Sequence, residues 1–545
     1  MRRWLWLAVP ALCLSVLPAG WAGAELPSPT GTVMVPMRDG VELETDYYLP
    51  PEGEGPYPAI LARSVYGREM GAVWANEILP WGIALVMQDT RGRGGSEGAD
   101  RAFADDGWGE RQDGVDTVEW IREQDWCNGA VGTRGGSALG LTQLFLAAAG
   151  ADVQAQFIAV AASEFYGQLA YQGGVWRKAA VENWLEMQDL EPIEERWQAH
   201  PVYDAFWRDY DFASRASHVT APGIHFSGWF DIFAQGNIDN FLTRQYEGGA
   251  GARGNQIMVM GPWPHNITRE IGDLTLPGNY NFDINALSER FFRHWLLEED
   301  TGVMEEPPVH YYTLGDVEDP GAPGNEWRTA DTWPPFETES TPFYLSPEGQ
   351  LHGAMGEVAG GTQRYTYDPA DPVPTHGGQN LFIPAGPFDQ QELGERDDVL
   401  TFATEPLEEP LEITGRVTVD LYVSTDAPDT DFTAKLVDIY PDGREILMLD
   451  SIQRVKFRDG FEEPDPLPEG EIGKITIDLW SISLVFNEGH RVGLHISSSN
   501  HPRFEVNPNS GDDFPTEDNL RPAENTVHMG EAYPSALNLP VRPDE

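Results

Sequence analysis

The sequence predicts an α/β fold that carries an inserted helical segment and is followed by a C-terminal domain of β-strands. Up to about residue 155, short apolar runs bounded by Gly and Pro alternate with helical periodicity, as in a doubly wound sheet. Residues 160–220 break this rhythm with tryptophans among acidic turns. After about residue 335 the apolar runs alternate as strands with hardly a helix between them, which is typical of a β-sandwich or jelly roll.

The chain divides into five segments along its length. We predict that residues 1–24 are a signal peptide, 25–155 and 221–335 the two parts of the α/β core, 156–220 a helical cap, and 336–545 the jelly-roll domain. An aromatic insertion in an α/β sheet often covers an active site, although ordinary helix packing explains the tryptophans equally well. The predicted strands are 32–35, 41–49, 59–62, 83–87, 223–227, 257–260, 413–423, 432–440, 475–479 and 491–498, and the predicted helices are 114–123, 141–149 and 289–297.

The composition limits both the domain count and the partners. Of 545 residues 41% are hydrophobic, enough for a large core, so wholesale disorder is excluded. Because a single core stops growing near about 250–300 residues, we expect two or three domains. There are 35 Lys and Arg against 88 Asp and Glu, which gives a formal net charge of −53. Such a surface repels phosphate backbones and anionic lipid, so we expect no nucleic-acid partner and no peripheral membrane attachment.

The first 24 residues have the layout of a signal peptide. Two arginines precede the apolar stretch 4–17, and small residues occupy 22–24. The stretch is short for a membrane span, so we predict cleavage after Ala24 and a secreted or periplasmic protein. Cleavage would leave Cys127 as the one cysteine, so intramolecular disulfides are excluded. We expect Cys127 to be a buried, inert thiol.

Motifs that bind metals or phosphates are missing from the sequence. There is no HExxH and no paired CxxC, and Gly473-Lys474 is followed by isoleucine where a P-loop needs Ser or Thr. Glycines at 92, 94, 95 and 98 follow a predicted strand but open no helical pattern, which indicates a turn. We therefore predict no metal and no cofactor.

The strongest local signal surrounds Ser137. In Gly-Gly-Ser-Ala-Leu-Gly (135–140) a short strand enters, small residues crowd the serine, and an apolar helix leaves, which is the layout of a nucleophile elbow. Gly135 and Gly136 permit a sharp turn that lifts the hydroxyl clear, and the helix N-terminus supplies backbone donors for an oxyanion. The generic GxSxG pattern is not met, because Gly140 lies three residues after the serine.

A serine nucleophile needs a base, and the base needs a carboxylate to orient it. In α/β hydrolases the chain order is serine, acid, histidine. Asp231 and His265 each lie just past one of the two later core strands, so they fit that order. Alone, Asp231 could be a helix N-cap and His265 a turn residue, but three motifs in the right order favour a triad. His225 lies inside a strand and is interpreted as packed, and His294 lies in a helical stretch.

Further motifs recur in order along nearly the whole mature chain. They are Met-Arg-Asp-Gly-Val (37–41), Gln-Asp-Thr-Arg-Gly (88–92) with Ser-Glu-Gly (96–98), Asp-Trp-Cys-Asn-Gly (125–129), the elbow 135–140, Gly-Trp-Phe-Asp (228–231), Gly-Pro-Trp-Pro-His (261–265), Asp-Ala-Pro-Asp-Thr-Asp-Phe (426–432), Tyr-Pro-Asp-Gly (440–443) and Ser-Ser-Ser-Asn-His-Pro-Arg-Phe (497–504). This set resembles the CocE/NonD family, the cocaine esterase / X-prolyl dipeptidyl peptidase hydrolases. The resemblance implies an α/β-hydrolase core with a cap and a C-terminal jelly roll.

The resemblance also implies roles for five residues. Ser137 is the nucleophile, His265 the general base and then acid, and Asp231 its orienting carboxylate. The oxyanion hole combines the N–H of Ala138 with the hydroxyl of Tyr66, which lies in the matching loop Ala-Arg-Ser-Val-Tyr (62–66). In this family the glycine also falls three residues after the serine. Relatives usually carry tyrosine after the nucleophile, so the alanine here makes one pocket wall smaller.

The substrate class stays open within this family, which includes carboxylesterases, β-lactam acylases, α-amino-acid ester hydrolases and dipeptidyl peptidases. Amine-recognising members need pocket carboxylates, and the cap offers Glu164, Glu182, Glu186 and Asp189, although exposed helix faces explain these equally well. We favour hydrolysis of small carboxylic esters because it needs fewer specific groups. The alternatives are an X-Pro dipeptidyl-peptidase or amino-acid ester/amide acylase on short peptide-like substrates and, from another class, a jelly-roll binding module with a vestigial hydrolase domain.

Overall fold

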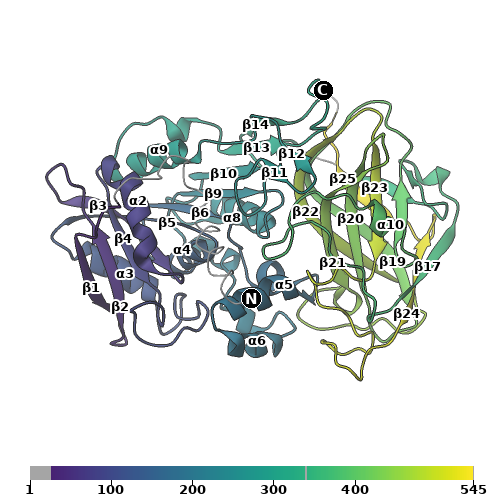
Figure 1. The fold of residues 1–545 in the computed structure, drawn as a ribbon, viewed down its shortest axis with the longest axis horizontal. Coiled ribbons are helices and arrows are strands. Elements are labelled where there is room, and N and C mark those ends of the chain that lie inside the picture. Colours follow the sequence, from purple (N-terminus) through teal and green to yellow (C-terminus); the bar gives the residue numbers. More distant parts are fainter. Residues whose placement is uncertain (1–25, 338–339, 544–545) are drawn as a thin grey trace.

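A ten-stranded sheet forms the first half of the computed structural model, which describes residues 26–337 and 340–543 (Figure 1). The strand order is β1-β2-β4-β3-β5-β6-β9-β10-β13-β14, and every pairing from β4 to β13 is parallel. The strands are β1 (Gly31–Pro36), β2 (Glu42–Tyr48), β3 (Tyr57–Ser64), β4 (Ala84–Asp89), β5 (Cys127–Gly136), β6 (Ala155–Ala159), β9 (Gly223–Gly228), β10 (Gln256–Gly261), β13 (Val309–Thr313) and β14 (Glu326–Ala330). The predicted signal peptide lies outside the described residues.

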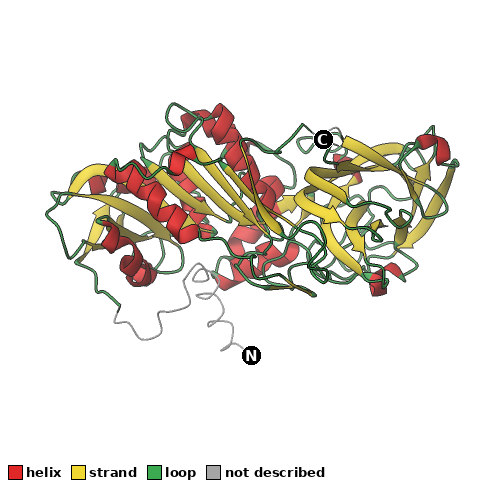
Figure 2. Cartoon of the chain, turned by 90° about the horizontal axis from the view of Figure 1, so that it is seen from above, coloured by secondary structure: helices red, strands yellow, loops and turns green. Residues whose placement is uncertain are grey.

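Helices cover both faces of this sheet (Figure 2). They are α2 (Gly71–Ile78), α3 (Asp113–Arg122), α4 (Ala138–Ala148), α8 (Ala234–Glu247) and α9 (Ile284–Leu297). Apolar residues of α2 and α9 pack against one face, and those of α3 and α4 pack against the other. The predicted doubly wound α/β fold is confirmed, while α2 was not predicted, since its eight residues hold too few turns to show a clear period.

The segment between β6 and β9 forms a cap in which aromatic side chains pack together. It contains β7 (Tyr171–Gln172), β8 (Val175–Trp176), α5 (Lys178–Met187), α6 (Glu191–Gln198) and α7 (Ala205–Arg208). In Figure 1, α5 and α6 lie between the ten-stranded sheet and the C-terminal strands. The cap boundary predicted at residue 156 falls inside β6, whose residues are buried and paired with β5 and β9, so the sheet continues to Ala159.

Two antiparallel sheets face each other in the C-terminal part of the chain. One has the order β16-β15-β25-β19-β24-β17 with β22 paired to β19, and the other is β18-β23-β20-β21. The strands are β15 (Ser340–Leu345), β16 (Leu351–His352), β17 (Gly361–Tyr367), β18 (Leu400–Ala403), β19 (Leu411–Thr425), β20 (Asp431–Ile439), β21 (Glu445–Arg454), β22 (Gly473–Phe486), β23 (Arg491–Ser497), β24 (Ala523–Met529) and β25 (Ala536–Pro540). The short helix α10 (Gln391–Gly394) and the hairpin β11 (Glu270–Ile271) and β12 (Leu274–Thr275) complete the α-helices and strands of the described residues.

The β-sandwich packs directly on the α/β core. One apolar cluster contains buried residues of both, and the Gln379 side chain of the C-terminal part donates to the Trp229 carbonyl of the core (2.9 Å). The Ser481 hydroxyl of β22 donates to the Gln235 side chain at the start of α8 (2.9 Å). The sandwich is therefore held beside the loop that leaves β9. In the described part of the chain, no helix combines the length and the apolar character that a membrane crossing requires.

Candidate active site

Ser137 occupies a tight turn between β5 and α4. Its backbone has φ 55° and ψ −126°, a conformation that costs energy in any residue with a Cβ. The turn is held because the Ser137 N–H donates to the Ala159 carbonyl (2.9 Å) and the Ser137 carbonyl accepts from Gly140 and Leu141 (2.8 and 2.9 Å). The serine is thus the N-cap of an almost completely buried helix.

The glycines around the serine are required by close approach. A Cβ on Gly135 would lie 2.6 Å from the Leu139 Cβ, and one on Gly140 would lie 2.9 Å from the Ala161 Cβ. Both distances are shorter than the contacts that Cβ atoms make in folded proteins, so a larger residue at either position would push α4 away from the sheet. This is the packing reason for the glycine three residues after the serine, in place of the GxSxG spacing.

Asp231 and His265 are brought together at the carboxyl ends of neighbouring strands. Asp231 follows β9 and His265 follows β10, and the Asp231 Oδ2 lies 2.5 Å from the His265 Nδ1. Both side chains are buried, with 0% and 6% of their surface exposed. The other carboxylate oxygen, Oδ1, accepts the Phe233 N–H (2.6 Å), which fixes the carboxylate plane. This arrangement can hold one imidazole tautomer and stabilise an imidazolium.

The sheet topology places Ser137 and Tyr66 at the same edge as this pair. Parallel strands end at one edge, and Ser137 follows β5 while Tyr66 follows its neighbour β3. Phe233 links the two halves of the edge. Its ring lies edge-on to the His265 ring (6.3 Å), and it lines the same pocket as Ser137. All five predicted site residues therefore lie at this one edge, Tyr66, Ser137, Asp231 and His265 on turns or loops and Ala138 at the start of α4.

The loop that carries Tyr66 is held on both sides. The Tyr66 N–H donates to the Ser64 hydroxyl (3.0 Å), and two residues on, Arg68 pairs with Asp89 (2.8 Å) and Glu44 (2.7 Å). Burial of the Asp89 carboxylate raises its pKa, although the neighbouring guanidinium opposes that rise. Ala138 is the first residue of α4, where backbone N–H groups have no partner within the helix.

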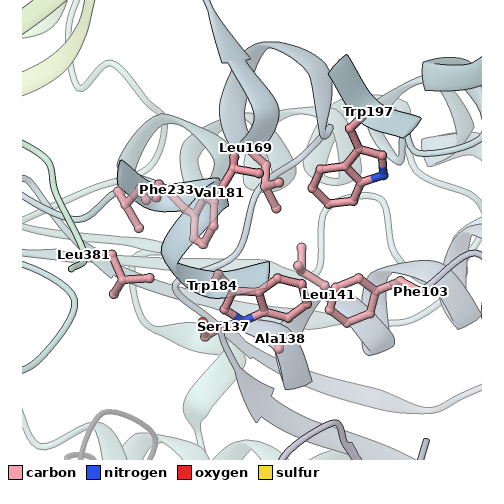
Figure 3. Close-up of a pocket in the computed structure, with 12 residues that line it drawn as sticks. Phe103, Ser137, Ala138, Leu141, Leu169, Val181, Trp184, Trp197, Phe233 and Leu381 are labelled. Atoms are coloured by element: carbon pink, nitrogen blue, oxygen red, sulfur yellow. The ribbon is translucent and has the colours of Figure 1, made fainter. Parts of the chain in front are cut away.

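A pocket opens over Ser137 beneath the cap (Figure 3). Apart from the serine, every side chain that lines it is apolar or aromatic. Its lining residues are Phe103, Ser137, Ala138, Leu141, Leu169, Ala180, Val181, Trp184, Trp197, Ile232, Phe233 and Leu381. Three segments far apart in the sequence contribute, namely the core, the cap and, through Leu381, the C-terminal part. Such a site suits an uncharged apolar group next to the reacting carbonyl.

The four cap carboxylates considered for amine binding are not among the lining residues. Glu182 accepts hydrogen bonds from Lys178 (3.1 Å) and from the Trp176 indole (3.2 Å). Burial raises the pKa of Glu164 to about 8, and Asp211 and Asp239 add to that rise. Glu186 and Asp189 are exposed.

The two other histidines considered are held elsewhere by packing. His225 is fully buried in β9 with its Nε2 3.0 Å from the Gln256 Oε1, and burial lowers its pKa to about 3. His294 lies in α9 with its Nδ1 3.1 Å from the Glu299 carbonyl. The Cys127 thiol is half buried, and burial raises its pKa. Across residues 26–337 and 340–543, no group of three or more His, Cys, Asp or Glu could hold a metal ion.

Two site neighbours escaped the sequence reasoning. Trp184 donates its indole N–H to the Tyr66 hydroxyl (3.0 Å), and Arg177 donates to the carbonyl of Ile232, the residue after Asp231 (3.1 Å). The tryptophans of the cap were visible in the sequence, but nothing there distinguished the one that meets the core from those that pack within the cap.

The chain matches two known families in consecutive parts. Residues 39–192 and 179–266 match the X-Pro dipeptidyl-peptidase (S15 family), and residues 301–538 match the X-Pro dipeptidyl-peptidase C-terminal non-catalytic domain. The cocaine esterase of Rhodococcus sp. is 33% identical over 94% of this chain and 98% of its own length.

Solved structures share the fold over the same extent. An aminopeptidase from a marine sediment Thaumarchaeota archaeon has a TM-score of 0.81 at 24% identity, covering 97% of this chain and 99% of its own. A CocE/NonD family hydrolase of Staphylococcus aureus has a TM-score of 0.72 at 20% identity, covering 94% of this chain and 93% of its own. The core, the cap and the β-sandwich thus form one architecture that recurs as a unit.

Proposed function

We propose that this chain, which belongs to the CocE/NonD family of serine hydrolases, is an exported carboxylesterase that transfers an acyl group from its substrate to Ser137 and then to water. Serine hydrolase activity on esters or peptides follows from the family. The observation that supports the finer proposal best is the 2.5 Å contact between Asp231 and His265 at the sheet edge that carries the strained Ser137.

Acylation begins when the Ser137 Oγ attacks the ester carbonyl carbon. His265 takes the hydroxyl proton at Nε2, while Asp231 holds the Nδ1–H and stabilises the imidazolium that forms. The carbonyl oxygen becomes an oxyanion, which the Ala138 N–H and the Tyr66 hydroxyl stabilise. The tetrahedral intermediate collapses when His265 returns the proton to the leaving alkoxide, so an alcohol departs and the acyl group stays on the serine.

Deacylation repeats these steps with water as the nucleophile. His265 removes a proton from water, the resulting hydroxide attacks the acyl carbonyl, and the same two donors hold the second oxyanion. Collapse breaks the bond to the Ser137 Oγ, which regains its proton from His265. A carboxylic acid leaves, and the enzyme returns to its starting protonation state with no cofactor consumed.

The lining of the pocket supports esters over substrates with a free amine. An ammonium group that enters an apolar pocket loses hydration and needs a carboxylate partner to compensate. No Asp or Glu is among the residues that line the pocket in the described part of the chain. An X-Pro dipeptidyl-peptidase or an amino-acid ester acylase would need such a carboxylate, so the pocket lining favours an esterase over both. These two activities are the alternatives that the substrate test below distinguishes.

A matched pair of substrates tests this proposal. We expect kcat/KM for the p-nitrophenyl ester of butyrate to exceed that for the ester of α-aminobutyrate, which differs by one ammonium, and to exceed that for an Xaa-Pro anilide. Ser137→Ala supplies the background hydrolysis. A faster Xaa-Pro anilide would favour the dipeptidyl-peptidase. Failure of a fluorophosphonate probe to label the Ser137 peptide would favour a binding module with a vestigial hydrolase.

Export is proposed from the first 24 residues, whose charged start, apolar stretch 4–17 and small residues 22–24 match a secretory signal. Expression of the full chain in a bacterial host should give a periplasmic or secreted enzyme that starts at Glu25. N-terminal sequencing checks this, and a chain recovered with residues 1–24 intact in the cytoplasm would contradict it.

A further inference from the structure

Helix α5 of the cap spans the active site from the acid to the oxyanion side. Arg177 precedes its first residue and donates to the Ile232 carbonyl beside Asp231, while Trp184, two turns further, donates to Tyr66. Residues seven apart lie on one face of a helix, so this face is turned toward the sheet edge. Ala180 and Val181, between the two, line the pocket.

The hydrogen bond from Trp184 has a defined direction. An indole N–H can only donate, so the Tyr66 oxygen accepts, at 3.0 Å, through a lone pair and not through its own hydrogen. A phenol oxygen that accepts one hydrogen bond becomes a stronger donor in the next, because each bond polarises the following one in a low-dielectric site. The contact therefore strengthens the Tyr66 O–H as a donor.

Packing fixes Trp184 in place before any substrate binds. Its ring stacks on Phe103 with centroids 5.7 Å apart and planes 17° apart, and Figure 3 shows it beside Ser137 and Ala138. At the other end of α5, the buried Arg177 is held by the carbonyls of Gln168 and Ile232 and lies 5.6 Å from the Trp480 ring of the sandwich. The indole N–H is consequently preorganised toward Tyr66.

We propose that Trp184 is a positioning residue for the oxyanion hole. From its place in the cap, the Trp184 indole N–H orients and polarises the Tyr66 hydroxyl. This proposal rests on the proposed function, in which Tyr66 stabilises the oxyanion. It separates two roles of one side chain. The ring of Trp184 forms a pocket wall and contributes to substrate binding, whereas its N–H acts through Tyr66 and contributes to the transition state, where negative charge develops on the substrate oxygen.

A double-mutant cycle with Tyr66→Phe and Trp184→Phe tests the coupling. The Trp184 variant keeps an aromatic ring on Phe103 but has no N–H. One hydrogen bond between neutral groups contributes about 0.5–1.5 kcal/mol, so we expect kcat on a p-nitrophenyl ester to fall about two- to thirteenfold with a smaller change in KM. In the Tyr66→Phe background the same substitution should change kcat less than about twofold, because the hydroxyl it acts through is gone.

Trp207→Phe is the matched control. Trp207 is a buried cap tryptophan outside the pocket lining, and its indole donates to the His200 carbonyl (2.8 Å). Removing that bond should loosen the cap to a similar extent and leave kcat within about twofold of the unmodified enzyme. If Trp207→Phe lowers kcat as much as Trp184→Phe, general loosening of the cap explains the loss and the proposal is wrong.

The remaining outcomes separate the two proposals. An equal loss from Trp184→Phe in both backgrounds, or a change in KM alone, overturns the positioning role while Tyr66 keeps its own. An unchanged kcat in Tyr66→Phe instead overturns the oxyanion role from which the inference starts. Should Trp184→Phe not fold, Trp184→Leu, which also lacks an N–H, replaces it in the cycle, and its loss must likewise shrink when the Tyr66 hydroxyl is absent.

Discussion

Glu164 should make the stability of the cap depend on pH, in a direction that its surroundings determine. Its Oε1 accepts the Gly167 N–H (2.7 Å), while its buried Oε2 has no hydrogen-bond partner among the described residues. Burial raises the pKa to about 8 from an ordinary value of 4.5, and the nearby carboxylates of Asp211 and Asp239 add to this. At neutral pH the Glu164 carboxyl is therefore protonated in the folded protein, whereas a glutamate in the unfolded chain is ionised.

The size of the effect follows from linkage. Between pH 4.5 and pH 8 the folded state binds a proton that the unfolded state has released, so the free energy of unfolding falls as pH rises through this window. Each pKa unit is worth about 1.36 kcal/mol, so a shift from 4.5 to about 8 gives an upper limit of ~5 kcal/mol, all of it lost above pH 8. Relaxation and water entry on ionisation reduce the measured value, and we expect a few kcal/mol.

Glu164→Gln removes the titration and keeps an acceptor for Gly167. Urea unfolding followed by tryptophan fluorescence at pH 5.5 and pH 8.5 measures the effect, since the cap carries several buried tryptophans. We expect the variant to be more stable than the unmodified enzyme at pH 8.5 and to differ little from it at pH 5.5. Glu186→Gln, on the exposed side of α5, is the control and should follow the unmodified enzyme. If the free energy of unfolding of the Glu164→Gln variant changes between pH 5.5 and pH 8.5 as much as that of the unmodified enzyme, Glu164 is not the group that titrates.

Three further predictions concern the chemistry and the surface. Ser137→Ala should lower kcat by roughly 10⁴-fold with the circular dichroism spectrum unchanged, and Asp231→Asn should also lower it by several orders of magnitude, since the amide stabilises the wrong imidazole tautomer; activity of the serine variant near that of the unmodified enzyme would refute the mechanism. Tyr66→Phe should lose about 10²–10³ in kcat with little change in KM, as measured on a p-nitrophenyl ester, and a change confined to KM would make Tyr66 a substrate-packing residue. Removal of residues 1–24 would take away two arginines and no acids, so the processed chain would carry a charge of 33 − 88 = −55. Salt shortens the screening length from about 8 Å at ~0.15 M to about 3 Å at ~1 M, so the Tm of the processed protein should rise between about 0.05 and 1 M NaCl. A flat or falling Tm would show that the acidic surface is already compensated locally.

Local patterns were sufficient to predict the core of the fold. The strands β9 and β10 are short apolar runs, fully buried between parallel neighbours, and such runs stand out in a sequence. Some strands that form only because they pair with strands far away in the chain were not predicted from the sequence. Strand β24, Ala-Glu-Asn-Thr-Val-His-Met, has a largely polar composition, and it is a strand because it pairs with both β17 and β19. Pairing between strands far apart in the chain is a tertiary property that composition does not express.

The same limit explains which parts of the site could be predicted. Ser137, Asp231 and His265 each follow a strand in a parallel sheet, and the rule that such strand ends meet at one edge needs only the order of elements. The cap follows no such rule. The sequence offered four carboxylates and several tryptophans there, and only the docked helix α5 shows that Trp184 faces Tyr66 while Glu186 faces away.

The position of α5 depends on the β-sandwich, which gives that domain a part in the site although it contributes no atom to the proposed chemistry. Trp480 has a positive φ of 72° at the bulge where β22 shifts its register against β19, and this places its ring over Arg177. Arg177 has lost its hydration, and no carboxylate in the part of the chain that the structure describes pairs with it. Burial lowers its pKa to about 9, so the aromatic face and the two carbonyls supply its compensation. A chain without the sandwich would expose this guanidinium and release the start of α5 from the loop after Asp231. Asp231 and Tyr66, the proposed acid and oxyanion donor, would then lose their common support together, which is a physical reason for the two families to occur joined in one chain.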